Sequence, residues 1–509
     1  MKRIALLLLI TALSACAADV KISTIFTDNM VLQRGVKVPV WGTADAGEEV
    51  SVAFDKQTVK VTADKDGNWK AELESLEAGG PFELTVAGKT TLTIKNVLVG
   101  DVWICSGQSN MEFTVNGALN SKDEIAKADF PQIRHIKVAN KVGLEPKDSI
   151  SGKWAVCSPQ TAGGFTAVGF FFARELHQEL KVPIGLIHSS WGGTPAESWT
   201  SREVLEGDPD LKVIMDRSDW GLKEFPKQKE KYEQDLKDWQ AAAEKAKADG
   251  KPAPAKLKAP AEPDKNPWYA SGLYNGMIKP LIPFAIKGAI WYQGESNAGR
   301  AFQYRKLFPA MIQDWRKRWG QDFPFFFVQL ANYTARKPEP AESDWAELRE
   351  AQTMTLSLPK TGMAVIIDIG DDKDIHPKNK QDVGKRLALA ADAIAYGKEI
   401  EYSGPMYDSM AVEGNTVRIK FKHLGGGLEA KGGGEPKGFA IAGADKKWVW
   451  AQAKIDGETI VVSSDRVEKP AAVRYAWANN PECNLYNKAG LPASPFRTDD
   501  WDGVTKNNK

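Results

Sequence analysis

The sequence has few of the residues that build metal centres or disulfide frameworks. Its 509 residues include four cysteines and five histidines. No group of Cys and His has metal-ligand spacing, so no metal site is expected. Three cysteines (Cys105, Cys157 and Cys483) lie beyond the first 17 residues, so at most one disulfide can form among them and one thiol is left over. The scarcity excludes a small domain held together by disulfides.

An excess of one charge and a long apolar run are also lacking. The chain has 67 basic and 66 acidic residues and no long basic face, which argues against nucleic acid as a partner. Beyond the amino-terminal leader, no segment is long and apolar enough to span a bilayer. Tryptophan, in contrast, is abundant, with 17 residues. Indole rings often form the floors of sugar-binding sites, although most of these tryptophans must belong to the core.

Residues 1–17 have the pattern of a secretory signal peptide. Lys2 and Arg3 precede an apolar run, and small residues follow it. The chain is therefore expected to be exported, as a periplasmic, outer-membrane-anchored or extracellular bacterial protein. Two processing sites fit. Ala15-Cys16-Ala17 matches a small-x-small cleavage site, which we favour, whereas Leu13-Ser14-Ala15-Cys16 resembles a lipobox that would make Cys16 a lipid anchor.

The length predicts two to four domains, and hydrophobic patterning divides the chain into three parts. Residues 19–95 and 398–509 alternate apolar and polar residues in short runs, which predicts β-sandwich-like domains at both ends. Residues 96–397 alternate strand-like and helical segments, which predicts an α/β domain with a mainly parallel sheet covered by helices. The carboxy-terminal tail is expected to pack on this domain.

The segment at about 220–266 is rich in Lys, Glu, Ala and Pro, and interrupts the α/β pattern. Its first half can form a charged helix over Lys227–Lys247, and the rest reads as an extended linker. A solvated surface excursion is the favoured interpretation, with a lid as the alternative.

The best candidate for a nucleophile is Ser109. The apolar run Val97–Ile104 predicts a buried strand, and the small and amide residues Ser106–Met111 follow it. A hydroxyl at such a strand-to-helix turn can face solvent beside free backbone N–H groups. An ordinary Ser/Asn-rich loop is the alternative interpretation.

Three other polar loops are predicted to follow strands of the same sheet. They are Trp191–Thr194, Gln293–Asn297 and Asp374–Pro377. Ligands of such sheets bind beyond the carboxyl ends of the strands, so these loops are expected to meet around Ser109.

His376 is the preferred general base, because it lies in an acidic loop immediately before the helix-starting Pro377. Asp374 is the first choice for orienting its imidazole, with Asp371 and Glu295 as alternatives. The other histidines are expected to be structural: His135, His177, His188 and His423.

Oxyanion donors are expected from backbone and amide groups around Ser109. The candidates are the N–H groups of Ser109 and of Gly192 or Gly193, and the side-chain amide of Gln293, with Asn297 as its alternative. A simple glycine turn and a buried amide bridge are the competing interpretations.

These motifs resemble those of the sialate O-acetylesterase family of the SGNH-hydrolase superfamily. The matching phrases are Gly107–Met111, Trp191–Thr194, Trp291–Asn297, Leu348–Gln352 and Asp374–Pro377. The resemblance covers nearly the whole mature chain. It implies a flavodoxin-like three-layer core with Ser109 as nucleophile and His376 as base. Two positions depart from the usual SGNH pattern: Lys373 stands where the acid is expected, and Gln293–Asn297 replaces a Gly-x-Asn-Asp block.

The resemblance implies a cofactor-free serine esterase that removes O-acetyl groups from carbohydrates through an acetyl-enzyme. The sugar stays open between sialic acid and plant glycans such as xylan or xyloglucan. Arg349 is a candidate contact for a sialic acid carboxylate, or else a buried structural group. Two other functions compete: a non-catalytic carbohydrate-binding protein, and a glycosidase in which Glu295 pairs with an acid of the His376 loop.

Overall fold

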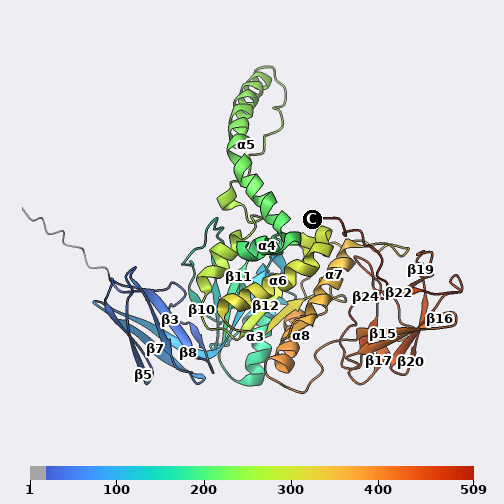
Figure 1. Cartoon of the computed structure of the whole chain (residues 1–509), viewed down its shortest axis with the longest axis horizontal. Helices are drawn as coiled ribbons and strands as arrows, with labels where there is room; N and C mark the ends of the chain where they lie inside the picture. The colour runs from blue at the N-terminus through green and yellow to red at the C-terminus, as the bar shows by residue number, and fades with distance from the viewer. Residues whose placement is uncertain (1–18) are drawn as a thin grey trace, which may run out of the picture.

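The computed structural model describes residues 19–509, which form a mixed α/β protein with several sheets (Figure 1). A central sheet with helices lies between an amino-terminal β unit and a carboxy-terminal β unit, at the blue and red ends of the chain. The predicted signal peptide, residues 1–17, and Cys16 lie outside the described residues. Cys105, Cys157 and Cys483 are all free thiols.

The central sheet carries the four polar loops. Neighbouring strands, in spatial order, are β10 (Trp154–Val156), β9 (Ile133–Lys137), β11 (Ile184–Ser190), β8 (Thr91–Gly107), β12 (Gly288–Tyr292), β13 (Phe325–Val328) and β14 (Thr361–Ala364). All of these pairings are parallel except that of β10 with β9. The carboxyl ends of β8, β11, β12, β13 and β14 therefore lie along one edge, as the alternating sequence pattern predicts.

Helices cover both faces of this sheet. On one face, the Trp103 ring of β8 lies 5.0 Å from Phe172 of α3 (Ala167–Leu180), and α3 packs along α8 (Lys380–Ile394). On the other face, Trp291 of β12 lies 6.0 Å from Trp315 of α6 (Ala301–Trp319), beside which α7 (Asp344–Met354) packs. Adjacent strand residues point to opposite faces, so the apolar runs need helices on both sides.

The amino-terminal unit is continuous with the central sheet through β8. Its other strands are β1 (Lys21–Ile22), β2 (Val31–Gln33), β3 (Val38–Thr43), β4 (Glu49–Phe54), β5 (Gln57–Thr62), β6 (Asn68–Leu73) and β7 (Gly79–Ala87). The first part of β8 pairs antiparallel with β7, and its second part pairs parallel with β11 and β12. The boundary that the sequence suggests between residues 95 and 96 thus falls inside one strand. A single hydrophobic core joins the two units.

The carboxy-terminal unit has a hydrophobic core of its own. Its strands are β15 (Met406–Glu413), β16 (Thr416–Lys422), β17 (Leu428–Ala430), β18 (Phe439–Ala442), β19 (Val449–Trp450), β20 (Gln452–Asp456), β21 (Thr459–Ser463), β22 (Ala472–Tyr475), β23 (Leu485–Asn487) and β24 (Phe496–Arg497). The tail beyond β24 reaches back to the central unit, where the Val504 N–H donates to the Glu347 carboxylate of α7 at 2.6 Å.

The charged segment forms one long helix, α5 (Pro209–Ala248), which projects from the body of the molecule (Figure 1). Its buried side chains, Leu211, Ile214 and Met215, all lie in its first two turns. The remaining helices are short: α1 (Ser109–Glu112), α2 (Ser121–Ala126) and α4 (Arg202–Gly207). Within residues 19–509, every helix is too short or too polar to cross a bilayer.

Candidate active site

A sharp turn between β8 and α1 presents Ser109. Gly107 has φ +134°, and a Cβ atom there would lie 2.2 Å from the carbonyl oxygen of Tyr292. Only glycine fits this close approach to β12. Ser109 is the first residue of α1, so its N–H has no acceptor within that helix. The turn thus exposes a hydroxyl beside an available backbone donor.

His376 is brought to Ser109 from the other end of the α/β unit. Its Nε2 lies 2.9 Å from the Ser109 Oγ, although 267 positions separate the two residues. The imidazole stacks 6.4 Å from the Phe113 ring, measured between centroids. A nucleophile hydrogen-bonded to a base in this way is the arrangement that activates a serine.

Asp374 is the acid nearest to the imidazole among the three candidates. Its Oδ1 lies 3.5 Å from His376 Nδ1 and accepts a 2.9 Å hydrogen bond from the His376 backbone N–H. Asp371 instead accepts backbone N–H groups of its own loop, which lowers the pKa of its carboxyl. Glu295 accepts from Asn110. Asp374 is therefore placed to orient the ring, at a distance longer than a strong hydrogen bond.

Gly192 lies beside the nucleophile, but its N–H has a partner. A Cβ atom at position 192 would stand 3.3 Å from the Ser109 Cβ, so a side chain there would require its neighbours to shift by a few tenths of an ångström. The Gly192 N–H donates to Glu112 Oε2 at 2.7 Å, and Glu112 also pairs with Lys137 at 3.2 Å. Gly193 follows with φ +74° and open space around it. The sequence reasoning missed Glu112, although it directly follows the quoted motif.

The amides of Gln293 and Asn297 form a buried brace. Gln293 Nε2 donates to the Thr194 carbonyl at 3.2 Å and to Asn297 Oδ1 at 2.6 Å. Asn297 Nδ2 in turn donates to Glu197 Oε2 at 2.8 Å. Both hydrogens of the Gln293 amide are therefore used in this structure. This arrangement matches the interpretation of these amides as a buried hydrogen-bond bridge. The hydrogen bonds hold the loop after β11 against the loop after β12.

A buried polar chain lies behind the nucleophile. Asn110 donates to Glu295 Oε1 at 2.7 Å and to the Ile375 carbonyl at 3.1 Å, and accepts from Lys380 Nζ at 2.5 Å. One amide thus connects the residue after the nucleophile with the residue before the base. Lys380 begins α8, where a positive charge opposes the helix dipole. That mismatch is the sequence signal that could have singled out Lys380.

Burial shifts the pKa values of both ionisable groups in this chain. Burial lowers the pKa of Lys380 to about 7, against the attraction of Glu295 and Asp374. It raises the pKa of Glu295, whose buried Oε2 has no hydrogen-bond partner among the described residues. The Lys380 ammonium also lies 5.1 Å and 5.0 Å from the ring centroids of Phe113 and Tyr292. Cation–π contacts offset part of the cost of burying the charged form.

Arg349 is a structural residue at the junction with the carboxy-terminal unit. Its fully buried guanidinium donates to the carbonyls of Leu330, Ala331, Ala478 and Asn479, at 2.6–2.9 Å. It makes no recorded ion pair with a described residue. This arrangement leaves it no role as a contact for a substrate carboxylate.

Replacing Arg349 is expected to affect stability and not substrate choice. In Arg349→Ala, the buried carbonyls lose a charged donor, and the unfolding free energy should fall by about 3 kcal/mol. Urea unfolding measures that loss, with Arg336→Ala at an exposed position as the control. The preference between acetylated sialic acid and a neutral acetyl ester should stay constant. A stable variant that loses activity only on sialic acid would contradict this assignment.

The other four histidines are held away from Ser109. His135 stacks on Phe165 at 4.4 Å, and burial lowers its pKa to about 3. His188 Nε2 lies 2.6 Å from the Ser190 Oγ, inside the sheet. His177 and His423 contact the Val182 carbonyl and the Glu401 carboxylate through Nδ1. His376 is thus the histidine that contacts the nucleophile.

Comparison with known proteins first identifies the central α/β part of the chain. The family model described as "Carbohydrate esterase, sialic acid-specific acetylesterase" matches residues 99–250 and 264–393, more than half of the sequence. The chain belongs to this family. The matched range contains Ser109 and His376 and stops short of the carboxy-terminal unit, so this sialic acid-specific acetylesterase family is defined by the α/β part.

Relatives of this acetylesterase family extend over both β units. Sialate O-acetylesterase of Rattus norvegicus is 33% identical, with 92% of this chain and 93% of the relative covered. The Homo sapiens protein is 30% identical over 94% and 92% of the two chains. A crystal structure of a carbohydrate acetylesterase from Xanthomonas citri has 40% identity and a TM-score of 0.82, covering 95% of this chain and all of that one. The protein is thus a carboxylic ester hydrolase acting on acetylated carbohydrates.

Proposed function

We propose that Ser109 removes acetyl groups from sugars through an acetyl-enzyme, with His376 as general base and Asp374 orienting it. The 2.9 Å contact between His376 Nε2 and Ser109 Oγ is the observation that carries this proposal. Ser109 Oγ attacks the acetyl carbonyl while His376 takes its proton. His376 then protonates the departing sugar oxygen, which leaves as a hydroxyl. Water, deprotonated by His376, next attacks the acetyl-enzyme, which releases acetate and returns the proton to Ser109. The proposed steps require neither a metal nor an organic cofactor.

The backbone N–H groups of Ser109 and Gly192, with Gly193 as the alternative glycine, are proposed to bind the oxyanion. Gly192 is close enough to Ser109, but its N–H must exchange the Glu112 carboxylate for the acyl oxygen. Glu112 then remains paired with Lys137. The Gln293 amide is proposed to act indirectly, because it holds the Thr194 carbonyl and thereby the glycine loop. A fully preorganised oxyanion donor supplies roughly 3–4 kcal/mol, and the exchange at Gly192 reduces its share.

Two further features belong to this proposal. A flavodoxin-like three-layer SGNH-hydrolase core is supported by the parallel sheet and by the helices on both faces. Export to the periplasm, the outer membrane or the medium is supported by the leader pattern of residues 1–17, with Cys16 as the anchor if the lipobox is used.

We propose that the substrate is a neutral acetylated glycan, such as acetylated xylan or xyloglucan oligosaccharides, in preference to acetylated sialic acid. Arg349, the cation considered for a sialic acid carboxylate, is buried among backbone carbonyls. Acetate release from 4-nitrophenyl acetate, acetylated xylo-oligosaccharides and 9-O-acetyl sialic acid tests the ranking. Faster release from sialic acid would reject the substrate proposal.

A non-catalytic binding protein is not favoured, because the nucleophile and base are in contact and the relatives are esterases. A glycosidase is not favoured either, since Glu295 is hydrogen-bonded behind the nucleophile and would leave Ser109 idle. Such enzymes release reducing sugar, whereas an esterase releases acetate.

Asp374→Asn is expected to lower kcat by about 10–100-fold. A buried, hydrogen-bonded triad acid contributes about 10⁴-fold, but Asp374 has a side chain 45% exposed and lies 3.5 Å from the imidazole. Steady-state kinetics with 4-nitrophenyl acetate measures the loss. Asp372→Asn, two residues earlier in the same loop, is the matched control and should keep wild-type kcat. If Asp371→Asn costs more than Asp374→Asn, the orienting acid is assigned wrongly.

A further inference from the structure

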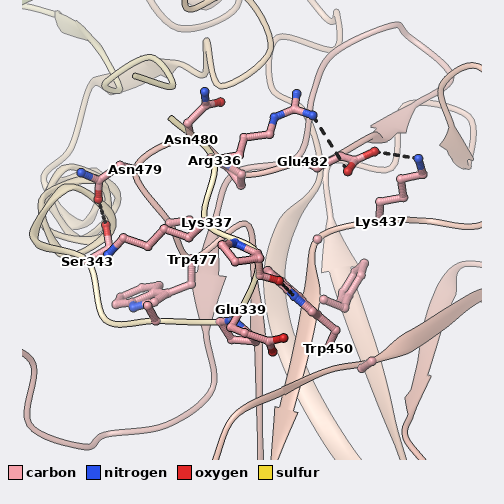
Figure 2. Close-up of a pocket in the computed structure, with 18 of the residues that line it drawn as sticks. Arg336, Lys337, Glu339, Ser343, Lys437, Trp450, Trp477, Asn479, Asn480 and Glu482 are labelled. Carbon is pink, nitrogen blue, oxygen red and sulfur yellow. Dashed lines mark hydrogen bonds and ion pairs between the residues drawn. The ribbon is translucent and has the colours of Figure 1, made fainter. Parts of the chain in front are cut away.

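A cavity of about 620 Å³ lies away from Ser109, at the junction of the central and carboxy-terminal units (Figure 2). One wall is the loop between β13 and α7, residues 335–343. The other wall is formed by residues 435–439, 450–453 and 477–482 of the carboxy-terminal unit. The volume falls in the usual range of small-molecule sites. The family model ends before this second wall, at residue 393.

We propose that this junction groove is a second glycan-binding site, which holds a neutral sugar chain whose acetyl groups are removed at Ser109. The inference rests on the proposed function, which it deepens by assigning the carboxy-terminal unit to substrate capture. It predicts that long acetylated oligosaccharides are better substrates than short ones.

Trp450 supplies the aromatic platform that a sugar face needs. Trp450 is 42% exposed and lines the groove. Its N–H donates to the Pro338 carbonyl at 2.7 Å, so the ring is fixed by the opposite wall (Figure 2). A fixed, exposed indole binds an apolar sugar face with little loss of conformational entropy.

The charges of the groove fit a neutral ligand. It is lined by three basic and four acidic residues: Arg336, Lys337, Lys437, Glu339, Glu342, Glu435 and Glu482. Figure 2 shows Arg336 and Lys437 approaching Glu482 from two sides, at 3.9 Å and 2.7 Å. With acids in slight excess and two of the three cations paired, the groove disfavours an anionic ligand, while its polar groups can still bond sugar hydroxyls.

Hydrogen bonds connect the groove to the His376 loop. Asn480, which lines the groove, accepts from Asn332 Nδ2 at 3.0 Å, and the Asn332 Oδ1 accepts from the Gly370 N–H at 2.7 Å. Gly370 begins the polar loop that carries His376 six residues later. These hydrogen bonds tie the groove wall to the loop that carries His376, and a sugar chain bound at Trp450 is proposed to extend along this wall toward Ser109.

Kinetics on substrates of increasing length tests the site. For the wild type, kcat/KM on acetylated xylo-oligosaccharides should rise with chain length, whereas 4-nitrophenyl acetate cannot occupy both sites. In Trp450→Ala, the ratio of kcat/KM on long oligosaccharides to that on 4-nitrophenyl acetate should fall about tenfold, through KM. Trp450→Phe, which keeps a ring, should recover most of that ratio. Trp220→Ala, at an indole 61% exposed on α5, is the matched control and should leave the ratio unchanged.

A binding measurement separates this proposal from the esterase proposal. Calorimetry with Ser109→Ala and a deacetylated neutral oligosaccharide should detect binding that Trp450→Ala weakens in the double variant. The glycan site is overturned if Trp450→Ala keeps the wild-type ratio of kcat/KM on long oligosaccharides to that on 4-nitrophenyl acetate. It is also overturned if an acidic oligosaccharide binds more tightly than the neutral one. If wild type hydrolyses none of the acetyl esters but binds the oligosaccharide through Trp450, the esterase mechanism is wrong and the glycan-binding site is supported.

Discussion

Ser109→Ala should lose about 10⁴-fold or more of kcat/KM on every acetyl ester tested. Without the hydroxyl, no acetyl-enzyme can form, and His376 has no proton to accept from a nucleophile 2.9 Å away. The remaining donors and the bound geometry can still assist water weakly, so the residual rate should exceed the uncatalysed one. Acetate release at saturating substrate measures kcat, and release at limiting substrate measures kcat/KM. The fold should persist, because Ser109 lies at the surface turn and not in the core.

The matched control is Ser296→Ala, a serine of the neighbouring loop that approaches the same site through its backbone N–H. It should retain wild-type activity. An organophosphonate should add once to wild type and to Ser296→Ala, but not to Ser109→Ala, as judged by intact mass. Substantial acetate release by Ser109→Ala, or its labelling at the same rate, would remove Ser109 from the nucleophile role.

The order and type of the central elements could be predicted from the sequence. Apolar runs such as Ile290–Tyr292 are buried on both faces, and only a covered parallel sheet makes such runs stable. Among the helices of the predicted α/β pattern, α3 has the Thr166 hydroxyl accepting the Gly169 N–H at its start. Local patterning and capping therefore carried enough information for the elements.

Contacts in the site that depend only on where the loops lie on the sheet could be predicted from the sequence. Ser109 and His376 meet because both follow strands of one parallel sheet, and the sequence places them at the same edge. Patterning also identified the acidic loop and made Asp374 the first choice over Asp371. Only the folded loop shows that the Asp374 carboxylate lies 3.5 Å from His376 Nδ1, whereas Asp371 accepts backbone N–H groups of Lys373 and Asp374.

Side-chain partners of buried polar groups were not predictable in the same way. Gln293 was expected to offer its amide to a ligand, but it bridges to Thr194 and Asn297. Arg349 bonds to carbonyls of two units that are far apart in the sequence. A buried donor takes whichever acceptor the tertiary fold supplies, and no local spacing encodes that acceptor. The continuity of β8 across the expected domain boundary has the same origin, because each half pairs with distant strands.

The buried Lys380 should make the stability of the protein increase with pH. Its folded pKa is lowered to about 7, whereas an unfolded lysine keeps a pKa of about 10.4. Between these values, the unfolded chain binds one more proton than the folded one, so the unfolding free energy rises by about 1.4 kcal/mol per pH unit. Relative to a variant without the amine, wild type should gain roughly 4 kcal/mol from neutral pH to pH of about 10.

Lys380→Met keeps the length of the side chain and removes the titrating amine. The difference in unfolding free energy between wild type and this variant should therefore rise by about 1.4 kcal/mol per pH unit. Lys378→Met, at an exposed position two residues earlier, is the control and should leave the slope in place. Glu295, the buried acid of the same polar chain, has a raised pKa and acts in the opposite direction. Its stabilising contribution is present below its unfolded pKa and is lost as pH rises through its folded pKa.

The two contributions begin in different pH ranges, because the Glu295 effect begins near its unfolded pKa and the Lys380 effect begins near neutrality. Urea unfolding of wild type and Lys380→Met at several pH values measures the difference curve. A flat curve above neutral pH would mean that Lys380 stays charged in the fold, held by Glu295 and the rings of Phe113 and Tyr292. Lys380→Met should also lower kcat, because Asn110 loses the donor that fixes it between Ser109 and the His376 loop.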